Sequence, residues 1–173
     1  MRAIKNICNG IGLVSEWSSR IAVCLIIVLI VIINYEVVMR YIFNAPTLWS
    51  HVLSYLVGAV LATMGLAYVW HHNANVRIDV IYSRFSLKGK LLVDIIFTLI
   101  FFFPCIIMLI NAFGQEVLHS YQVKEKVWMA AWYPVLWPVK AMVTIGLGLL
   151  LLQGIATFLR DVMALVKGGK EPW

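Results

Sequence analysis

The chain has 173 residues, with 14 Lys and Arg against 8 Asp and Glu, and it is 62% hydrophobic and only 13% charged. A soluble domain carries about 25% charged residues, so this composition predicts a protein of the lipid bilayer, folded as one domain over residues 1–173. The basic excess lies in loops and not in one stripe, which argues against nucleic-acid binding and is typical of residues that flank membrane spans.

Before the first long apolar run, Ile4, Ile7, Ile11 and Val14 recur at helical spacing, with polar residues between them. This pattern predicts a short amphipathic helix that lies along the inner membrane surface. The apolar run that follows is not succeeded by a small-residue cleavage site, so we do not expect a removable signal peptide.

Four apolar segments are long enough to cross a bilayer, which requires about 20 residues each. They are residues 21–43, 51–71, 91–112 and 135–159. The sequence therefore predicts an all-α fold, an integral membrane four-helix bundle with the short N-terminal interfacial helix attached. Pro104 lies within the third span, where its missing amide hydrogen predicts a kink.

The distribution of positive charge predicts the orientation of the spans. Ten of the Lys and Arg residues lie in the N-terminal segment, the loop between spans two and three, and the tail, and four lie on the other side. Because Lys and Arg are enriched in cytoplasmic segments, both termini are expected in the cytoplasm. Trp49 and Trp137 are then on the outer side, as expected for an aromatic belt.

Small residues mark one face of the second span. Gly58, Ala62 and Gly65 are spaced so that they share one side of a helix, and small faces let transmembrane helices approach closely. These residues are candidates for a subunit interface. Single polar groups within the spans, such as Asn34 and Gln153, are expected to form hydrogen bonds between helices.

Glu36 and Arg40 are charged residues at the end of an apolar run. Four residues apart, with Glu first, they lie on one helical face in the favourable order. One interpretation is an intrahelical ion pair that makes two charges tolerable in this position. The other is that this face docks against another protein, because intramembrane charges usually face protein or water. The two interpretations are compatible, and both stay open from the sequence.

The cysteines and histidines, which often form catalytic or metal sites in other proteins, are scattered along this sequence. Cys8, Cys24 and Cys105 form no metal or disulfide motif. His51 and His119 are both on the outer side but are poorly placed to hold a haem. We find no nucleophile–base pair within a span and no phosphate-binding glycine loop, so we expect no enzyme, no metal site and no cofactor bound by this chain.

Several segments together resemble a known family. They are Glu36, Arg40–Tyr41, Phe43–Asn44, Trp49, "AYVWHHNANVRIDVIYSRFS" (67–86), Asp94, Pro104, "WYPVLWPVK" (132–140) and "LLLLQGIATFLRD" (149–161). With them the chain resembles the small permease subunit, the Q component, of tripartite ATP-independent periplasmic (TRAP) transporters, over nearly its whole length. The most specific piece is Val76–Asp79, which contains Arg77 and Asp79. The chain departs from the family after Trp49, where Ser50, His51 and Val52 stand in place of the usual acidic residue.

The resemblance implies a three-component system in the bacterial inner membrane. A periplasmic binding protein captures an organic acid, and a large permease (M) subunit moves it with a sodium gradient. The small subunit braces the large one and contributes to docking of the binding protein. The residues expected at the interface with the large subunit are Glu36, Arg40, Trp49, Gly58, Ala62 and Gly65. Arg77 and Asp79 are expected to fix the cytoplasmic loop, and Lys124, Glu125 and Lys126 to meet the binding protein.

Two other functions remain as alternatives. One is a stand-alone small exporter with four spans and a membrane-embedded glutamate, for which Glu36 is placed too near the outer boundary. The other is a quinone- or haem-linked membrane protein, which the scattered histidines and unpaired cysteines disfavour. The substrate is not encoded in this chain, since it is expected to bind to the binding protein and the large permease.

Overall fold

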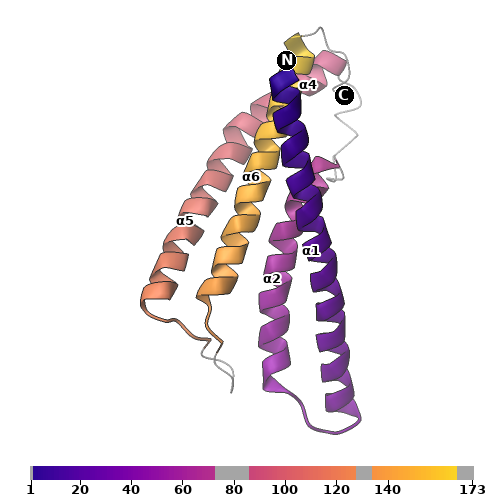
Figure 1. The fold of residues 1–173 in the computed structure, drawn as a ribbon, viewed down its shortest axis with the longest axis vertical. Coiled ribbons are helices and arrows are strands. Elements are labelled where there is room, and N and C mark those ends of the chain that lie inside the picture. Colours follow the sequence, from indigo (N-terminus) through magenta and orange to yellow (C-terminus); the bar gives the residue numbers. More distant parts are fainter. Residues whose placement is uncertain (1, 73–85, 128–133, 167–173) are drawn as a thin grey trace.

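A computed structural model of the chain describes residues 2–72, 86–127 and 134–166. Within these ranges the fold is helical, and the helices are shown in Figure 1. Their bounds are α1 Arg2–Tyr41, α2 Leu48–His71, α4 Leu87–Phe97, the π-helical segment η1 Thr98–Phe102, α5 Phe103–Gln122 and α6 Trp137–Val166. The described residues contain no strand, only an isolated antiparallel bridge between Lys126 and Val135.

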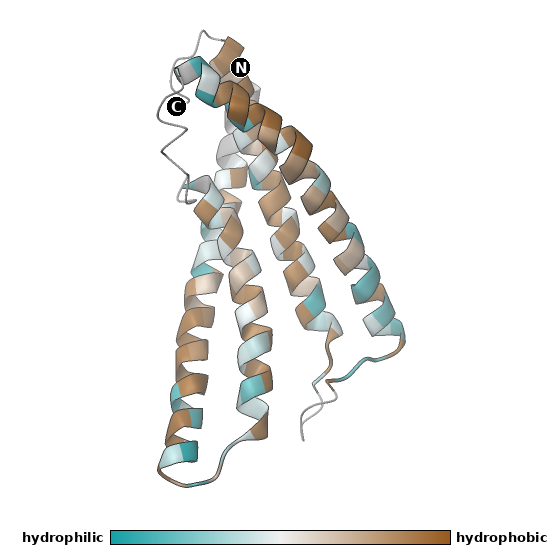
Figure 2. Ribbon diagram, turned by 180° about the vertical axis from the view of Figure 1, so that it is seen from behind, coloured by the Kyte–Doolittle hydropathy of each residue, from teal (hydrophilic) through white to brown (hydrophobic). Residues whose placement is uncertain are grey.

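Four helical stretches of the described chain are long and apolar enough to cross a membrane, which confirms the predicted four spans. They are Gly10–Tyr41, Leu48–Trp70, Lys88–Gln122 and Trp137–Val166. Hydrophobic residues cover most of the length of these helices (Figure 2). The third and fourth helical stretches extend well past their predicted ends at residues 112 and 159. A helix can continue into polar sequence where its backbone hydrogen bonds and side-chain contacts persist.

The N-terminal segment is helical, as predicted, but it is not a separate element. Residues 2–41 form one continuous α-helix of 40 residues, and its first part crosses over α6 (Figure 1). Ser15 and Ser18, which belong to this part of α1, are buried against the bundle. No helix-breaking residue separates the amphipathic segment from the first span, so the two stretches join into a single rod.

Pro104 is the second residue of α5, which follows the π-helical segment η1. A proline in a helix lacks its amide hydrogen and clashes with the carbonyl four residues earlier. Here the chain inserts a π-turn, in which the amide of Phe103 donates to the carbonyl of Thr98. The expected disturbance at Pro104 therefore takes the form of a π-bulge between α4 and α5.

The helix α6 is the centre of the bundle. It contacts α1, α2, α4 and α5, whereas α5 packs mainly on α6. In its most apolar stretch 39% of the residues are buried, against 11%, 17% and 6% in the other three spans. The hydrophobic core lies where α1, α2 and α6 meet and comprises Ala22, Val60, Met64, Val143 and Leu147.

The loop between α1 and α2 and the turn between α5 and α6 lie at one end of the molecule, opposite the N-terminus (Figure 1). We call this the hairpin end. Asn44 and Lys124, one in each connection, have φ values of 52° and 49°. Asparagine tolerates this left-handed conformation better than most residues. At Asn44 it reverses the chain, so that the amide of Ala45 donates to the carbonyl of Met39 at 3.0 Å.

Candidate functional site

Glu36 and Arg40 lie in the last turns of α1 at the hairpin end, and they form the ion pair predicted from their spacing. Arg40 donates to Oε1 of Glu36 from Nε at 3.1 Å and from Nη2 at 2.7 Å. The intrahelical interpretation of the pair is therefore confirmed. The contact occupies only one of the two carboxylate oxygens.

The second oxygen of Glu36 connects α1 to the start of α2. Oε2 accepts hydrogen bonds from the backbone amide of Thr47 at 3.1 Å, from the Thr47 hydroxyl, and from the Ser50 hydroxyl at 2.8 Å. Thr47 is the N-cap residue of α2, and the first turn of this helix has no acidic residue of its own. A helix N-terminus attracts negative charge, so Glu36 supplies from α1 the carboxylate that α2 lacks.

The sequence reasoning missed Thr47 and Ser50 as partners of Glu36. The Ser50 residue is only 1% exposed, and it lies immediately after Trp49. The short distance from the first span to Thr47 was the available signal, since a tight loop returns the chain to the end of α1. Together the residues Glu36, Arg40, Thr47 and Ser50 form what we call the Glu36 cluster.

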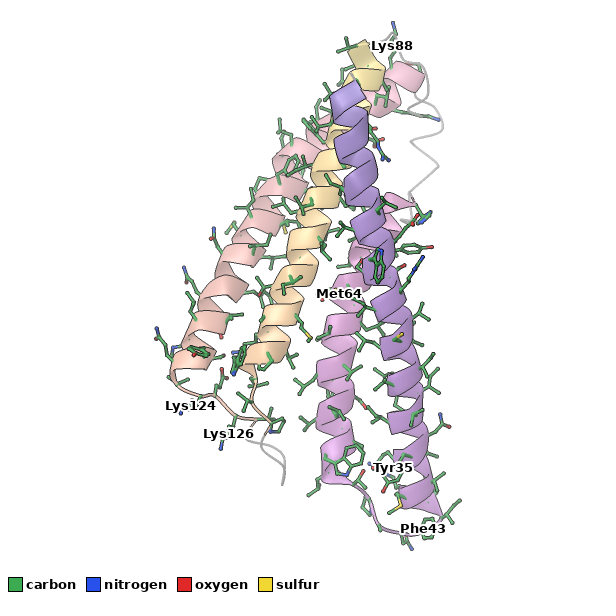
Figure 3. The ribbon with its side chains drawn as sticks, in the orientation of Figure 1. Tyr35, Phe43, Met64, Lys88, Lys124 and Lys126 are labelled. Carbon is green, nitrogen blue, oxygen red and sulfur yellow. The ribbon has the colours of Figure 1, made fainter. Side chains whose placement is uncertain are left out.

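Trp49, predicted at a subunit interface, packs within the chain on α1. Its ring centroid lies 5.6 Å from that of Tyr35, which Figure 3 labels near the hairpin end together with Phe43. Tyr41, Ile42 and Phe43 are all exposed. The aromatic side chains thus fasten α2 to α1 and leave apolar surface at the end of α1.

A second polar cluster joins α5, α6 and the turn between them. Nζ of Lys140 donates to Glu116 Oε2 at 2.9 Å, to Ser120 Oγ at 2.7 Å and to Glu125 Oε2 at 2.7 Å. The three donors of the ammonium are all used. Ser120, which is fully buried, donates in turn to Glu125. We call Glu116, Ser120, Glu125 and Lys140 the Lys140 cluster.

The Glu125 carboxylate is therefore bound by groups of the same chain, with 34% of its side chain exposed. The Lys140 ammonium, which donates a hydrogen bond to this carboxylate, and then the Ser120 hydroxyl hold the pKa of Glu125 below its ordinary value. Its neighbours Lys124 and Lys126 are exposed and project at the hairpin end (Figure 3). A cavity of about 420 Å³ lies between them and the aromatic pair Tyr121 and Trp137.

The small residues of α2 have different surroundings. A Cβ on Gly58 would lie 3.9 Å from Leu29 of α1, so this glycine faces a helix of the same chain. Gly65 has no atom within 4 Å of that position, and Ala62 is exposed. Two of the three predicted interface residues thus lie on an uncovered surface of the described bundle.

One buried polar contact links α1 to α6. The hydroxyl of Ser15 donates to Oε1 of Gln153 at 3.1 Å, and Ser18 donates to the carbonyl of Met64 on α2 at 3.3 Å. The prediction that Gln153 bonds to another helix is confirmed. Asn34 instead donates to the carbonyl of Ile30, one turn earlier in its own helix.

Two predicted site residues, Arg77 and Asp79, lie outside the described residues. Within the described ranges, no three His, Cys, Asp or Glu side chains are grouped so that they could hold a metal ion. The family model described as "Tripartite ATP-independent periplasmic transporters, DctQ component" matches residues 15–164. No curated protein matches the chain.

Proposed function

The chain belongs to the DctQ component family of the tripartite ATP-independent periplasmic transporters, and we propose that it braces the large permease of such a transporter. In this proposal the large permease takes up an organic acid with sodium, and a periplasmic binding protein delivers the acid. The chain is a multi-pass membrane protein; the proposal places it in the inner membrane with both termini in the cytoplasm.

The observation that supports the accessory role is that the carboxylates of Glu36 and Glu125 are bound by groups of the same chain. Both oxygens of the Glu36 carboxylate accept hydrogen bonds from residues of the same chain. The Glu125 carboxylate is held by Lys140 and Ser120 in the same way. Carboxylates bound in this manner rigidify the two hairpins instead of presenting ligands to a substrate or a coupling ion.

Most of the surface of the bundle is uncovered, which leaves room for a large partner. We propose that the large permease contacts the exposed side of α1 and α2. This side includes the region near Glu36 and Arg40 and continues to Ala62 and Gly65. Small residues there allow a helix of the partner to approach closely. Glu36 itself is mostly covered, with 14% of its side chain exposed, whereas Arg40 is 54% exposed, so Arg40 is the member of the pair that contacts the partner.

For the binding protein we propose a contact at the other hairpin, between α5 and α6. Lys124 and Lys126 are exposed there and lie beside the aromatic residues Tyr121 and Trp137. Glu125 contributes indirectly, because its bond to Lys140 fixes the turn on which both lysines lie.

The test is affinity purification of the tagged chain, expressed with its large permease, as wild type and as the Glu36→Ala, Arg40→Ala and double apolar variants. Each single change leaves an unpaired charge, which costs about 2.5–3.5 kcal/mol at the centre of a bilayer and less near its boundary. If this face docks on the large permease, all three variants retain less of it. If the double variant retained the large permease fully, the docking role would be rejected. The ion pair would then serve only to stabilise this chain.

A further inference from the structure

Arg20 of α1 lies at the depth of the hydrophobic core. Ala22, two residues later, belongs to that core together with Met64 of α2. Ser18, two residues earlier, donates to the carbonyl of Met64 at 3.3 Å. The stretch of α1 that is apolar enough to cross a membrane begins at Gly10, well before Arg20. The arginine therefore lies inside the membrane-spanning part of the helix and not at its start.

The polar residues of α6 show how deep this position is. Thr63 of α2 lies at the level of the core and against Gly146 of α6, so Arg20 and Gly146 are at about the same level. At 1.5 Å per residue along α6, Lys140 is then about 9 Å away toward the hairpin end, and Arg160 is about 21 Å away toward the other end. The two distances together match the hydrocarbon layer, which is about 30 Å thick. Arg20 is thus level with the interior of this layer, farther from the inner boundary than its side chain extends.

The guanidinium of Arg20 projects from the bundle. Arg20 is exposed, and its guanidinium lies 5.3 Å from the ring centroid of Trp17, which is itself 65% exposed. Glu16 precedes Arg20 by four residues, the spacing that favours an ion pair, yet Arg20 takes part in no ion pair among the residues that the structure describes. A charge at membrane depth usually faces protein or water and not lipid. The five N–H donors of this guanidinium therefore call for acceptors from another molecule.

We propose that a transmembrane helix of the large permease packs on the outward face of α1 and places a carboxylate against Arg20. Lipid chains offer no acceptor at this depth, whereas a carboxylate matches the fork of a guanidinium with two parallel hydrogen bonds. The rest of the outward face is exposed and mostly apolar, as a contact between membrane helices requires. It comprises Leu13, Trp17, Cys24, Ile27 and Val31.

This contact rests on the proposed function and adds a second site of attachment to it. It is separate from the contact at Arg40, because 20 residues of an α-helix rotate the direction of the side chain by about 200°. The large permease would therefore meet α1 on two faces, at Arg40 near the hairpin end and at Arg20 in the middle of the bundle.

The first experiment is affinity purification of the tagged full-length chain, expressed with its large permease, as wild type, Arg20→Gln and Arg20→Lys. We expect Arg20→Gln to lower the retained large permease about tenfold, because a charge-assisted pair is lost. Arg20→Lys should retain more than Arg20→Gln, since lysine keeps the charge and loses only the two-pronged geometry. The matched control is Lys88→Gln, which removes an exposed positive charge at the far end of the molecule and should leave retention unchanged.

A second experiment reports on the same face without changing Arg20. A photoreactive benzoylphenylalanine at Ile27, two turns farther along the outward face, should cross-link to the large permease in membranes. The melting temperature of Arg20→Gln purified alone should match that of the wild type, because Arg20 has no ion pair in the described chain to lose. If this variant fails to fold, the cross-link from position 27 decides.

Equal retention of the large permease by the wild type and a folded Arg20→Gln would overturn the inference. A cross-link from position 27 to lipid, or to a second copy of this chain, in place of the large permease would also overturn it. If the wild type itself retains no large permease, the proposed function fails and the inference fails with it. The failure of the inference alone is therefore distinguishable from the failure of the proposed function.

Discussion

Gly146 of α6 lies directly against Thr63 of α2. A Cβ built on this glycine would come within 2.8 Å of both Cβ and Oγ1 of Thr63, and within 3.0 Å of its carbonyl carbon. Thr63 cannot easily give way, because its hydroxyl is bonded to the carbonyls of Ala59 and Val60 in its own helix. The contact lies beside the core residues Met64 and Leu147, so Gly146 lets α2 and α6 pack closely at this point.

The first prediction is that Gly146→Ala destabilises the protein. The added methyl group has no space, and overpacking of this kind costs about 1–3 kcal/mol. Gly148→Ala is the matched control in the same helix, since no atom lies within 4 Å of its Cβ position. A glycine replaced by alanine in an open helical position gains about 0.5–1 kcal/mol. Thermal unfolding in detergent measures both, and equal shifts for the two variants would contradict the close α2–α6 contact.

The second prediction concerns the buried bond between Ser15 and Gln153. Side-chain hydrogen bonds between membrane helices contribute about 0.6 kcal/mol on average and up to about 1.7. A double-mutant cycle with Ser15→Ala and Gln153→Leu should give a coupling energy in this range, because the hydroxyl donates directly to the amide oxygen. A coupling energy of zero would mean that the N-terminal part of α1 does not pack on α6 as described.

The third prediction is a pH dependence that Glu125 confers. The pKa of this carboxyl is lowered in the folded protein by Lys140 and Ser120, so its contribution to stability is present above the ordinary Glu pKa, about 4.3. It is lost as the pH falls toward the lower folded value. Between pH 7 and pH 3 the melting temperature of the wild type should therefore fall more steeply than that of Glu125→Gln. Parallel curves would show that Glu125 is not held in the Lys140 cluster.

The fourth prediction is the orientation in the membrane. Lys88 and Lys124 are exposed and lie at opposite ends of the molecule (Figure 3). In a background without the native Cys8, Cys24 and Cys105, a cysteine at Lys124 should react with an impermeant maleimide in intact spheroplasts, whereas one at Lys88 should react only after permeabilisation. Labelling in the reverse order would place the termini outside the cytoplasm.

The sequence predicted the parts of this structure that depend on local patterns. The apolar runs predicted the four spans, and the four-residue spacing of Glu36 and Arg40 predicted their ion pair. Both features follow from helical geometry alone. The prediction of Gln153 as an interhelical group also held, since an amide in an apolar run needs a partner.

The remaining contacts depend on how the chain returns after each turn. Ser50 meets Glu36 across the α1–α2 loop, in which Asn44 has a positive φ. Glu125 meets Lys140 from 15 residues away because the α5–α6 turn folds back. Neither of these two contacts produces a periodic pattern in the sequence. The hydropathy pattern also predicted that the third span ends at residue 112, whereas α5 continues to Gln122. A helix can extend beyond its last apolar residue, so the apolar run does not determine where the helix ends.

Transport by reconstituted components tests the central claim most directly. Proteoliposomes containing this chain alone, the large permease alone, or both are supplied with the loaded binding protein and an inward sodium gradient. The account predicts uptake only when both membrane proteins are present, and none by this chain alone. Uptake or export by this chain alone would contradict it, as would full activity of the large permease without this chain.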